Sequence, residues 1–402
     1  MLASTTAAQP ARATMTPLLT LLFAIAGGIA VGNLYWSQPL LAVIAEDFGV
    51  TETSAGLLVT VTQLGYATGI LLIVPLGDTL NRRKLIPAAM FLSAVALVGA
   101  ALSPSYPLLM TALLALGLAT TAGQMITPLV GDLAAPEQRG RVVGTVVSGM
   151  LSGILLSRAL SGLIADVLGW RGVFCVAALA AVVMAVCMRR GIPEEPARPG
   201  VPYGHLLWSI YDSVRTHAVV RGTLLLGACV FAVFSMFWTA LTFLLSSAPY
   251  NYSLAQIGLV GLAGLAGAAA AKNAGRLHDG GLSVKAQGVA LVVTLGSLGL
   301  AGAGAHSIVV ILIAVVVLDG AIQTINVLNQ LRLLNLDAER RSRINSAFVT
   351  SNFIGGAIGS ALAGAVWPVA GWTGVMAVAA GMIGIACVVW IARRQTFEVS
   401  AG

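Results

Sequence analysis

The feature that most constrains the fold of this chain is a series of long apolar segments separated by short polar breaks. Each segment has about 20 residues, enough to cross the hydrocarbon core of a bilayer as a helix that satisfies its own backbone hydrogen bonds. Only 9% of the 402 residues are charged, too few for the surface of a soluble protein. The pattern predicts an all-α polytopic membrane protein with twelve transmembrane helices. The predicted spans are residues 18–39, 55–75, 85–102, 107–133, 142–165, 173–188, 219–245, 254–271, 286–303, 308–328, 344–366 and 373–392.

Basic residues sort to one side of this topology. The loops on the side of Arg12 hold nearly all of them, whereas the loops on the opposite side hold only Arg171, together with acids such as Glu46 and Asp47. By the positive-inside rule the basic side is cytoplasmic. The tails 1–17 and 393–402 are therefore predicted to be cytoplasmic, and membrane orientation explains the net charge of +7 better than nucleic-acid binding does.

The longest polar break, residues 189–218, is rich in proline and charge. This composition is typical of a linker, and we expect one short surface helix around residues 205–214. The linker divides the chain into an N-terminal bundle, 18–188, and a C-terminal bundle, 219–392, of six helices each.

The two halves resemble each other in sequence. A shift of 202 residues lays Gly153 on Gly355 and Trp170 on Trp372, within PEQRGRVV and AERRSRIN at one end and VLGWRGV and VAGWTGV at the other. Two related bundles joined by a linker predict a rocking transporter whose site lies between the halves, near the middle of the membrane.

Several motifs resemble those of one transporter family. The loop VPLGDTLNRRKL (74–85) matches the pattern G-x-L-a-D-r-x-G-R-R/K at Leu76, Asp78, Arg82 and Arg83, although both glycines are replaced. The chain also carries YWSQPLL (35–41) and LDGAIQTINVLNQ (318–330). By these motifs it resembles the major facilitator superfamily, and within it the bacterial twelve-helix exporters similar to drug:proton antiporters.

The resemblance implies roles for residues at the cytoplasmic side. In the family the loop motif closes that side, so Asp78 is expected to face the start of the eleventh helix and Arg82 to pair with Asp132. The resemblance thus predicts a cytoplasmic gate of Asp78, Arg82, Arg83, Asp132 and Arg141. The alternative is that the basic cluster only anchors the topology.

The fifth span departs from the family. GILLSRALSG (153–162) resembles the antiporter pattern G-x-x-x-G-P-x-x-G-G but places Arg158 at the proline position. A charge inside a span costs at least about 2.5–3.5 kcal/mol on insertion scales. Arg158 is therefore expected to have a function, or else to snorkel outward and bind water.

Polar side chains far from the span ends are the candidates for a substrate cavity, because they are costly in lipid. They fall mainly on the first, fourth, seventh and tenth spans, which line the cavity in the family. For each single amide, hydrogen bonding between helices is an equal alternative. The predicted cavity residues are Asn33, Trp36, Ser37, Gln63, Gln124, Thr127, Trp238, Gln323, Asn326 and Gln330.

Asp319 is the acid that lies deepest within a span, about 16 Å from its outer end at 1.5 Å per residue. Desolvation favours its neutral form, and a nearby cation favours the ionised form. Asp319 and Arg158 are thus the predicted proton-coupling residues, and we expect them to pair across the interface in at least one state. A fixed structural ion pair is the alternative for Asp319.

These observations predict a secondary transporter that exports a small organic compound, amphipathic or weakly acidic, by proton-coupled antiport and alternating access. Proton-coupled uptake of a metabolite is the alternative, and a non-transporting sensor on the same scaffold is a further one. No nucleophile–base pair or metal-ligand pattern is present in the sequence, so we expect no enzyme, no cofactor and no metal. The expected setting is the bacterial inner membrane and the expected state a monomer, with lipid, protons and substrate as its partners.

Overall fold

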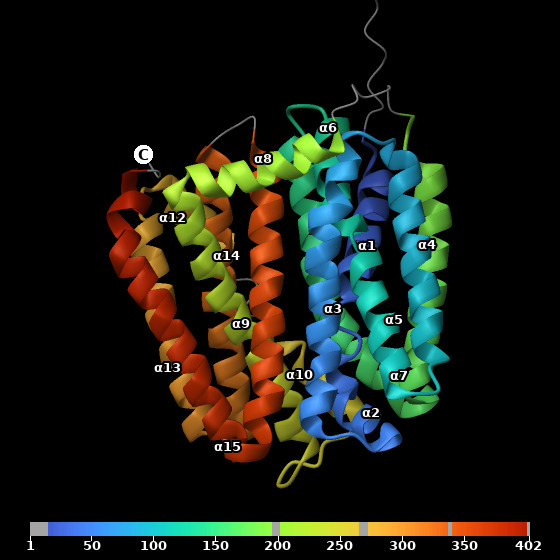
Figure 1. The fold of residues 1–402 in the computed structure, drawn as a ribbon, viewed down its shortest axis with the longest axis vertical. Coiled ribbons are helices and arrows are strands. Elements are labelled where there is room, and N and C mark those ends of the chain that lie inside the picture. Colours follow the sequence, from blue (N-terminus) through green and yellow to red (C-terminus); the bar gives the residue numbers. More distant parts are fainter. Residues whose placement is uncertain (1–14, 195–201, 265–271, 337–339, 400–402) are drawn as a thin grey trace, which may run out of the picture.

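The computed structural model describes residues 15–194, 202–264, 272–336 and 340–399. Parts of the predicted N-terminal tail, linker, eighth span and C-terminal tail lie outside these ranges. Within them the chain is helical, and Figure 1 shows two groups of helices side by side, with α8 (Tyr203–Thr216) lying across one end of both. We call this end the linker end and the opposite one the far end.

The first group contains the N-terminal half of the chain. Its elements are α1 (Pro17–Gly32), η1 (Gln38–Leu40), α2 (Leu41–Phe48), α3 (Glu52–Leu72), η2 (Val74–Asp78), α4 (Arg82–Ala101), α5 (Tyr106–Ala119), α6 (Ala122–Leu133) and α7 (Arg139–Gly191). The second group contains α9 (Ala218–Ser246), α10 (Leu254–Val260), α12 (Lys272–Asp279), α13 (Ser283–Ala303), α14 (Ile308–Leu336) and α15 (Arg341–Val399).

Two of these helices each contain two membrane-spanning arms. Among the described residues eight helices are long and apolar enough to span a membrane, and α7 and α15 have 53 and 59 residues. Helices of that length would extend about 80 to 90 Å if straight, far beyond the thickness of a bilayer. The chain turns at Gly169 and Gly371, whose φ values of 69° and 57° are in the left-handed region that favours glycine. In Figure 1 the two arms of α15 meet at the far end.

The predicted spans overlap described helices or arms, except that the eighth, 254–271, is described only over residues 254–264, which begin with α10. We expected the first span to be one continuous helix to residue 39, and this is wrong. Helix α1 ends at Gly32, and the chain passes through turns into η1. Pro39, within η1, is incompatible with a regular helix that reaches the predicted end of the span, because such a helix would lose a hydrogen bond and the ring would clash with the carbonyl of Tyr35.

The internal repeat is visible in the packing. A Cβ at Gly153 would lie 2.2 Å from the carbonyl oxygen of Gly28, and one at Gly355 would lie 2.1 Å from that of Ala228. The two glycines related by the 202-residue shift thus let α7 approach α1, and α15 approach α9, through backbone contact. Small residues at helix interfaces allow such approach in membranes, where helix association depends on close packing.

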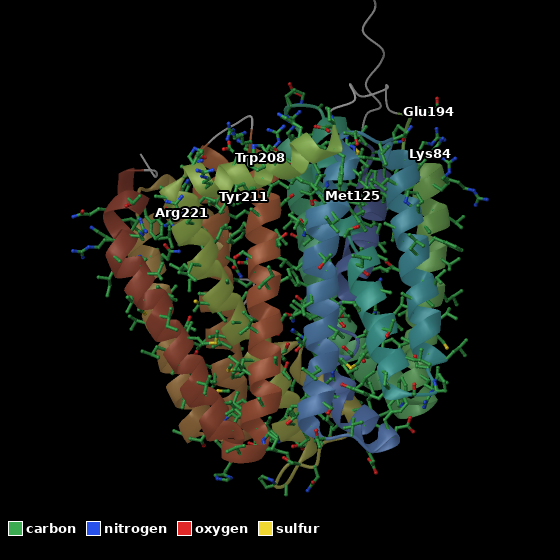
Figure 2. All side chains as sticks on the ribbon, viewed as in Figure 1. Lys84, Met125, Glu194, Trp208, Tyr211 and Arg221 are labelled. Carbon is green, nitrogen blue, oxygen red and sulfur yellow. The ribbon has the colours of Figure 1, made fainter. Side chains whose placement is uncertain are left out.

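Charged residues lie at both ends of the bundles, as the predicted topology requires. Figure 2 shows Lys84, Glu194 and Arg221 at the linker end. At the far end Arg171 forms an ion pair of 2.8 Å with Asp47. The predicted linker helix, 205–214, is observed as α8, with Trp208 and Tyr211 exposed.

Candidate functional site

A cavity of about 660 Å³ lies between the two bundles. It extends from Tyr35 and Asp319 at its deep end to Asp132 and Arg341, which lie near helix ends on the linker end. Its wall is mostly apolar, with amides and a few charged groups. The polar lining residues of α6 and α14 include Gln124, Thr127, Asp319, Gln323, Asn326 and Gln330. The aromatic lining residues come from other segments and are Tyr35, Tyr66, Phe231, Phe234 and Phe353.

The far end of the interface is closed by direct contact between the bundles. The hydroxyl of Thr53 donates to the carbonyl oxygen of Gly364 at 2.8 Å, and the hydroxyls of Thr60 and Ser360 are hydrogen-bonded at 2.8 Å. At Gly162 a Cβ would lie only 2.0 Å from the carbonyl oxygen of Leu254. The structure is thus open toward the linker end and closed at the far end.

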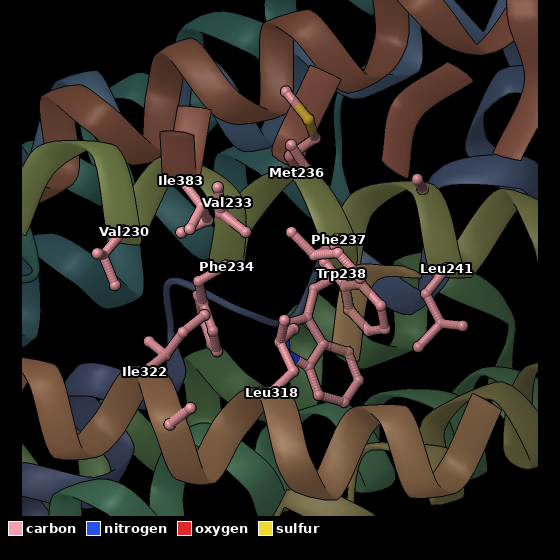
Figure 3. Close-up of a cluster of buried hydrophobic side chains, with 14 of the residues drawn as sticks. Val230, Val233, Phe234, Met236, Phe237, Trp238, Leu241, Leu318, Ile322 and Ile383 are labelled. Atoms are coloured by element: carbon pink, nitrogen blue, oxygen red, sulfur yellow. The ribbon is translucent and has the colours of Figure 1, made fainter. Parts of the chain in front are cut away.

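Asp319 sits at the deep end of the cavity on α14, with only 4% of its surface exposed. Its Oδ1 accepts a hydrogen bond of 3.2 Å from Nε1 of Trp238 on α9. Figure 3 shows Phe234 and Trp238 directed from α9 toward α14, among Leu318 and Ile322. The other acids in the described wall, Asp78 and Asp132, lie near the mouth.

Arg158 lies on α7 behind this deep end and is 2% exposed. Its Nε donates to Oε1 of Gln38 at 2.8 Å. Three aromatic rings surround the guanidinium: its Cζ lies 4.1 Å from the ring centroid of Trp238, 4.9 Å from Tyr35 and 5.4 Å from Phe234. Such contacts stabilise a cation away from water by about 0.5 to 2 kcal/mol each.

No direct salt bridge within 4.0 Å joins Arg158 and Asp319 among the described residues of this state. Instead Trp238 contacts both, stacking on the guanidinium and donating to the carboxylate. The predicted pairing in at least one state stays a prediction, and Trp238 is the side chain that connects the two charges here.

The predicted cavity residues divide into two sets. Gln124, Thr127, Gln323, Asn326 and Gln330 line the cavity, and Nε2 of Gln124 donates to the hydroxyl of Tyr66 at 3.1 Å. The other five, which are Asn33, Trp36, Ser37, Gln63 and Trp238, are buried outside its described wall. Their role in substrate binding stays a prediction.

The buried set forms contacts within and between bundles. Nε1 of Trp36 donates to Oδ1 of Asn33 at 3.0 Å, across the turns where α1 has ended. Nε2 of Gln63 donates to the hydroxyl of Ser235 at 2.8 Å and so joins α3 to α9 across the interface. Asn33, Trp36 and Ser37 thus lie in the turns between α1 and η1 and not within the continuous helix of the predicted first span.

The predicted gate residues lie around the mouth of the cavity. Arg82 forms an ion pair of 2.8 Å with Asp132, as the resemblance implied, and both line the cavity with Asp78. Arg83 forms an ion pair of 2.6 Å with Glu194, and Arg141 is exposed near the start of α7. The gating role of these residues stays a prediction.

Sequence reasoning missed the phenylalanines of the wall and the burial of Arg332. Phe231 and Phe353 stack at 4.8 Å between ring centroids and cover one side of the cavity. Arg332 is 1% exposed; it donates to Oε1 of Gln287 at 2.8 Å, and its Cζ lies 4.0 Å from the ring centroid of Phe397. Apolar runs do not reveal which phenylalanine faces a cavity, whereas Gln287 and Arg332 could have been noticed as polar residues within apolar runs.

Comparison with known proteins identifies this architecture. The model of the Major Facilitator Superfamily matches residues 21–331. The chain belongs to this superfamily. It is a transporter embedded in a membrane, not an enzyme.

Relatives within the superfamily cover nearly the whole chain. An uncharacterized transporter of Escherichia coli O157:H7, YgaY, is 40% identical over 376 residues, which are 94% of this chain and 95% of the relative. A probable transporter of Streptomyces coelicolor, SCO4007, is 34% identical over 359 residues, or 89% and 83% of the two chains.

Solved structures share the superfamily fold. A bacterial homologue of the human lysosomal transporter Spinster, inward-facing and unoccupied, has a TM-score of 0.75 at 12% identity, covering 96% of this chain and 98% of its own. The human organic anion transporter MFSD10 has a TM-score of 0.68 at 18% identity, covering 94% and 100%. At these identities the likeness concerns the fold alone.

Proposed function

We propose that this chain is a proton-coupled secondary transporter that exports a small organic compound, amphipathic or weakly acidic, by alternating access. One observation carries the proposal: the deep end of a cavity between two bundles holds a carboxylate, Asp319 on α14, which is 4% exposed and accepts a hydrogen bond from Trp238 on α9 of the same bundle. A buried carboxylate that faces a cavity between two bundles is suited to carry a proton.

In this proposal the bundles 18–188 and 219–392 rock about the cavity in the inner membrane of a bacterium, with both termini cytoplasmic. The linker end is then the cytoplasmic side, and the structure is an inward-facing state. Breaking the Arg82–Asp132 ion pair and re-forming it shifts the balance between states, because each state makes contacts that the other lacks. We infer the same gating role for Asp78, Arg83 and Arg141.

Uptake by symport is the second candidate, and Arg158 favours it. A buried cation behind the cavity suits an anionic substrate, and an anion would move with a proton rather than against one. Direction of coupling thus depends on the charge of the substrate.

The test is flux in proteoliposomes with an imposed pH gradient. The purified chain is reconstituted, a panel of labelled organic acids, amines and neutral compounds is offered, and accumulation is measured for wild type and Asp319→Asn. We expect accumulation that follows the gradient in wild type and is lost in the variant. Glu46→Gln, at an exposed acid of the far end, is the matched control and should behave as wild type. Substrate movement that ignores the gradient would remove the proton-coupling claim.

A further inference from the structure

Arg158 is a buried cation whose hydrogen-bonding capacity is only partly used. Its Nε donates to Gln38, but Nη1 and Nη2 have no hydrogen-bond partner among the described residues. A guanidinium has five N–H donors, and a buried donor without an acceptor destabilises the protein, more so when the group is charged. The aromatic rings around it stabilise the charge but fill none of the hydrogen-bonding positions as an oxygen would.

Solvent has little room to supply the missing acceptors. The space beside the guanidinium, between Gln38 and Thr242, measures about 10 Å³. One water needs about 10–15 Å³, so this space holds one at most. Two free nitrogens of a planar fork match the two oxygens of a carboxylate, which Arg binds in a bidentate manner.

The guanidinium is one side chain away from the cavity. Tyr35 and Phe234 both contact it, and both line the deep end of the cavity. A rotation of these two rings, without movement of the backbone, would open the guanidinium to a ligand in the cavity.

From these contacts we propose that Arg158 binds the carboxylate of an organic monocarboxylate with an apolar, preferably aromatic, body. Phe231, Phe353 and Tyr66 line the same cavity and supply the surface for that body, since ring–ring contacts add to the stabilisation that burial gives. The inference rests on the part of the proposed function that export and uptake share, because it assumes that this cavity carries the substrate and that Asp319 carries the proton.

Charge balance gives the coupling. The titratable and charged groups that face Arg158 among the described residues are the phenol of Tyr35 and, across Trp238, the carboxylate of Asp319. Without substrate, the charges of Arg158 and an ionised Asp319 add up to a net charge of zero. A bound carboxylate changes the net charge of the site to −1, and a proton on Asp319 brings it back to zero. A low-dielectric site favours a net charge of zero.

The carboxylate and the proton therefore bind together and cross together. A cationic substrate bound at Asp319 would give the site a net charge of +1, and so would a proton there. Since a low-dielectric site favours a net charge of zero, a cationic substrate is disfavoured. The inference therefore selects an anion for the substrate class and, between the two candidates above, favours uptake by symport over export.

Benzoate tests this directly, with benzamide as its neutral isostere and benzylammonium as its cationic counterpart. The full chain, purified in detergent, is titrated with each at constant ionic strength while its thermal unfolding is followed. We expect a saturable stabilisation by benzoate alone, and at least a tenfold weaker apparent affinity in Arg158→Gln. Arg332→Gln, which removes another buried arginine outside the cavity wall, should keep the wild-type response.

Proteoliposomes with a pH-sensitive dye in the lumen then report the sign of coupling. An inward benzoate gradient should acidify the lumen of wild-type vesicles, and Asp319→Asn should bind benzoate yet move no protons. Equal responses of the wild type to benzoate and benzamide, including no response to either, would overturn the anion site. A full benzoate response in Arg158→Gln would overturn it as well.

The two proposals fail separately. Benzoate transport that needs Arg158 but moves no proton would refute the proposed coupling and keep the anion site. Proton-coupled transport of benzylammonium through Asp319, with benzoate equal to benzamide, would refute the anion site and keep the proposed function.

Discussion

Gly162 provides the sharpest test of the closed far end. It lies on α7 where a Cβ would meet the carbonyl oxygen of Leu254, the first residue of α10, at 2.0 Å. Real Cβ atoms essentially never approach closer than 3.0 Å, so Gly162→Ala must push the two bundles apart by about 1 Å at this point. The strain falls on the state seen here, because only this state brings α7 and α10 into backbone contact.

The size of the effect follows from the cost of overpacking. Extra carbon atoms in a well-packed interface cost about 1–3 kcal/mol. If only one of two states bears that cost, their ratio changes by about 5- to 150-fold. Gly162→Ala should therefore shift the population toward the state that is open at the far end.

Distances between spin labels at the far end measure this shift. Labels at Glu46→Cys and His306→Cys, in a background without the native cysteines, report the separation of the two bundles. The control is Gly153→Ala, whose Cβ would lie 2.2 Å from Gly28 within one bundle and which should lower thermal stability without changing the distances. Identical distance distributions for Gly162→Ala and Gly153→Ala would refute the reasoning.

Three further perturbations test individual contacts. Ser360→Ala removes the hydroxyl that bonds Thr60 across the closed end at 2.8 Å; a loss of about 0.5–1.5 kcal/mol in this state should lengthen the same spin-label distances by populating the open form, and an unchanged distribution would contradict it. Trp238→Phe keeps a ring beside Arg158 but removes the donor to Asp319, so proton-coupled flux should fall while the melting temperature stays near that of the wild type; unaltered flux would show that this hydrogen bond is not needed. Tyr203→Phe removes the hydroxyl that ties α8 to the carbonyl oxygen of residue 72 at 2.6 Å, and amide hydrogen exchange over 203–216 should become faster; equal exchange rates would show that other contacts hold the helix.

Much of the fold could be predicted because lipid imposes simple rules on sequence. Apolar spans of about 20 residues must be helices, and the helices and arms of the structure follow them. The shift of 202 residues likewise predicted equivalent packing, which is observed at Gly153 and Gly355. The break at Gly32 was not predicted, because the polar residues that follow it, such as Asn33 and Ser37, were interpreted as cavity-lining groups within a span.

The sequence by itself determined which residues are costly enough in a membrane to need a reason, and Arg158 and Asp319 were identified on that ground. Only the tertiary structure decided what surrounds them. Trp238 lies between the two charges, Asp319 faces the cavity, and Arg158 is set behind Tyr35 and Phe234. Periodicity fixes the face of one helix at most, whereas the contact of a side chain from α7 with rings from α9 depends on how two bundles pack, and that packing is a property of the whole chain.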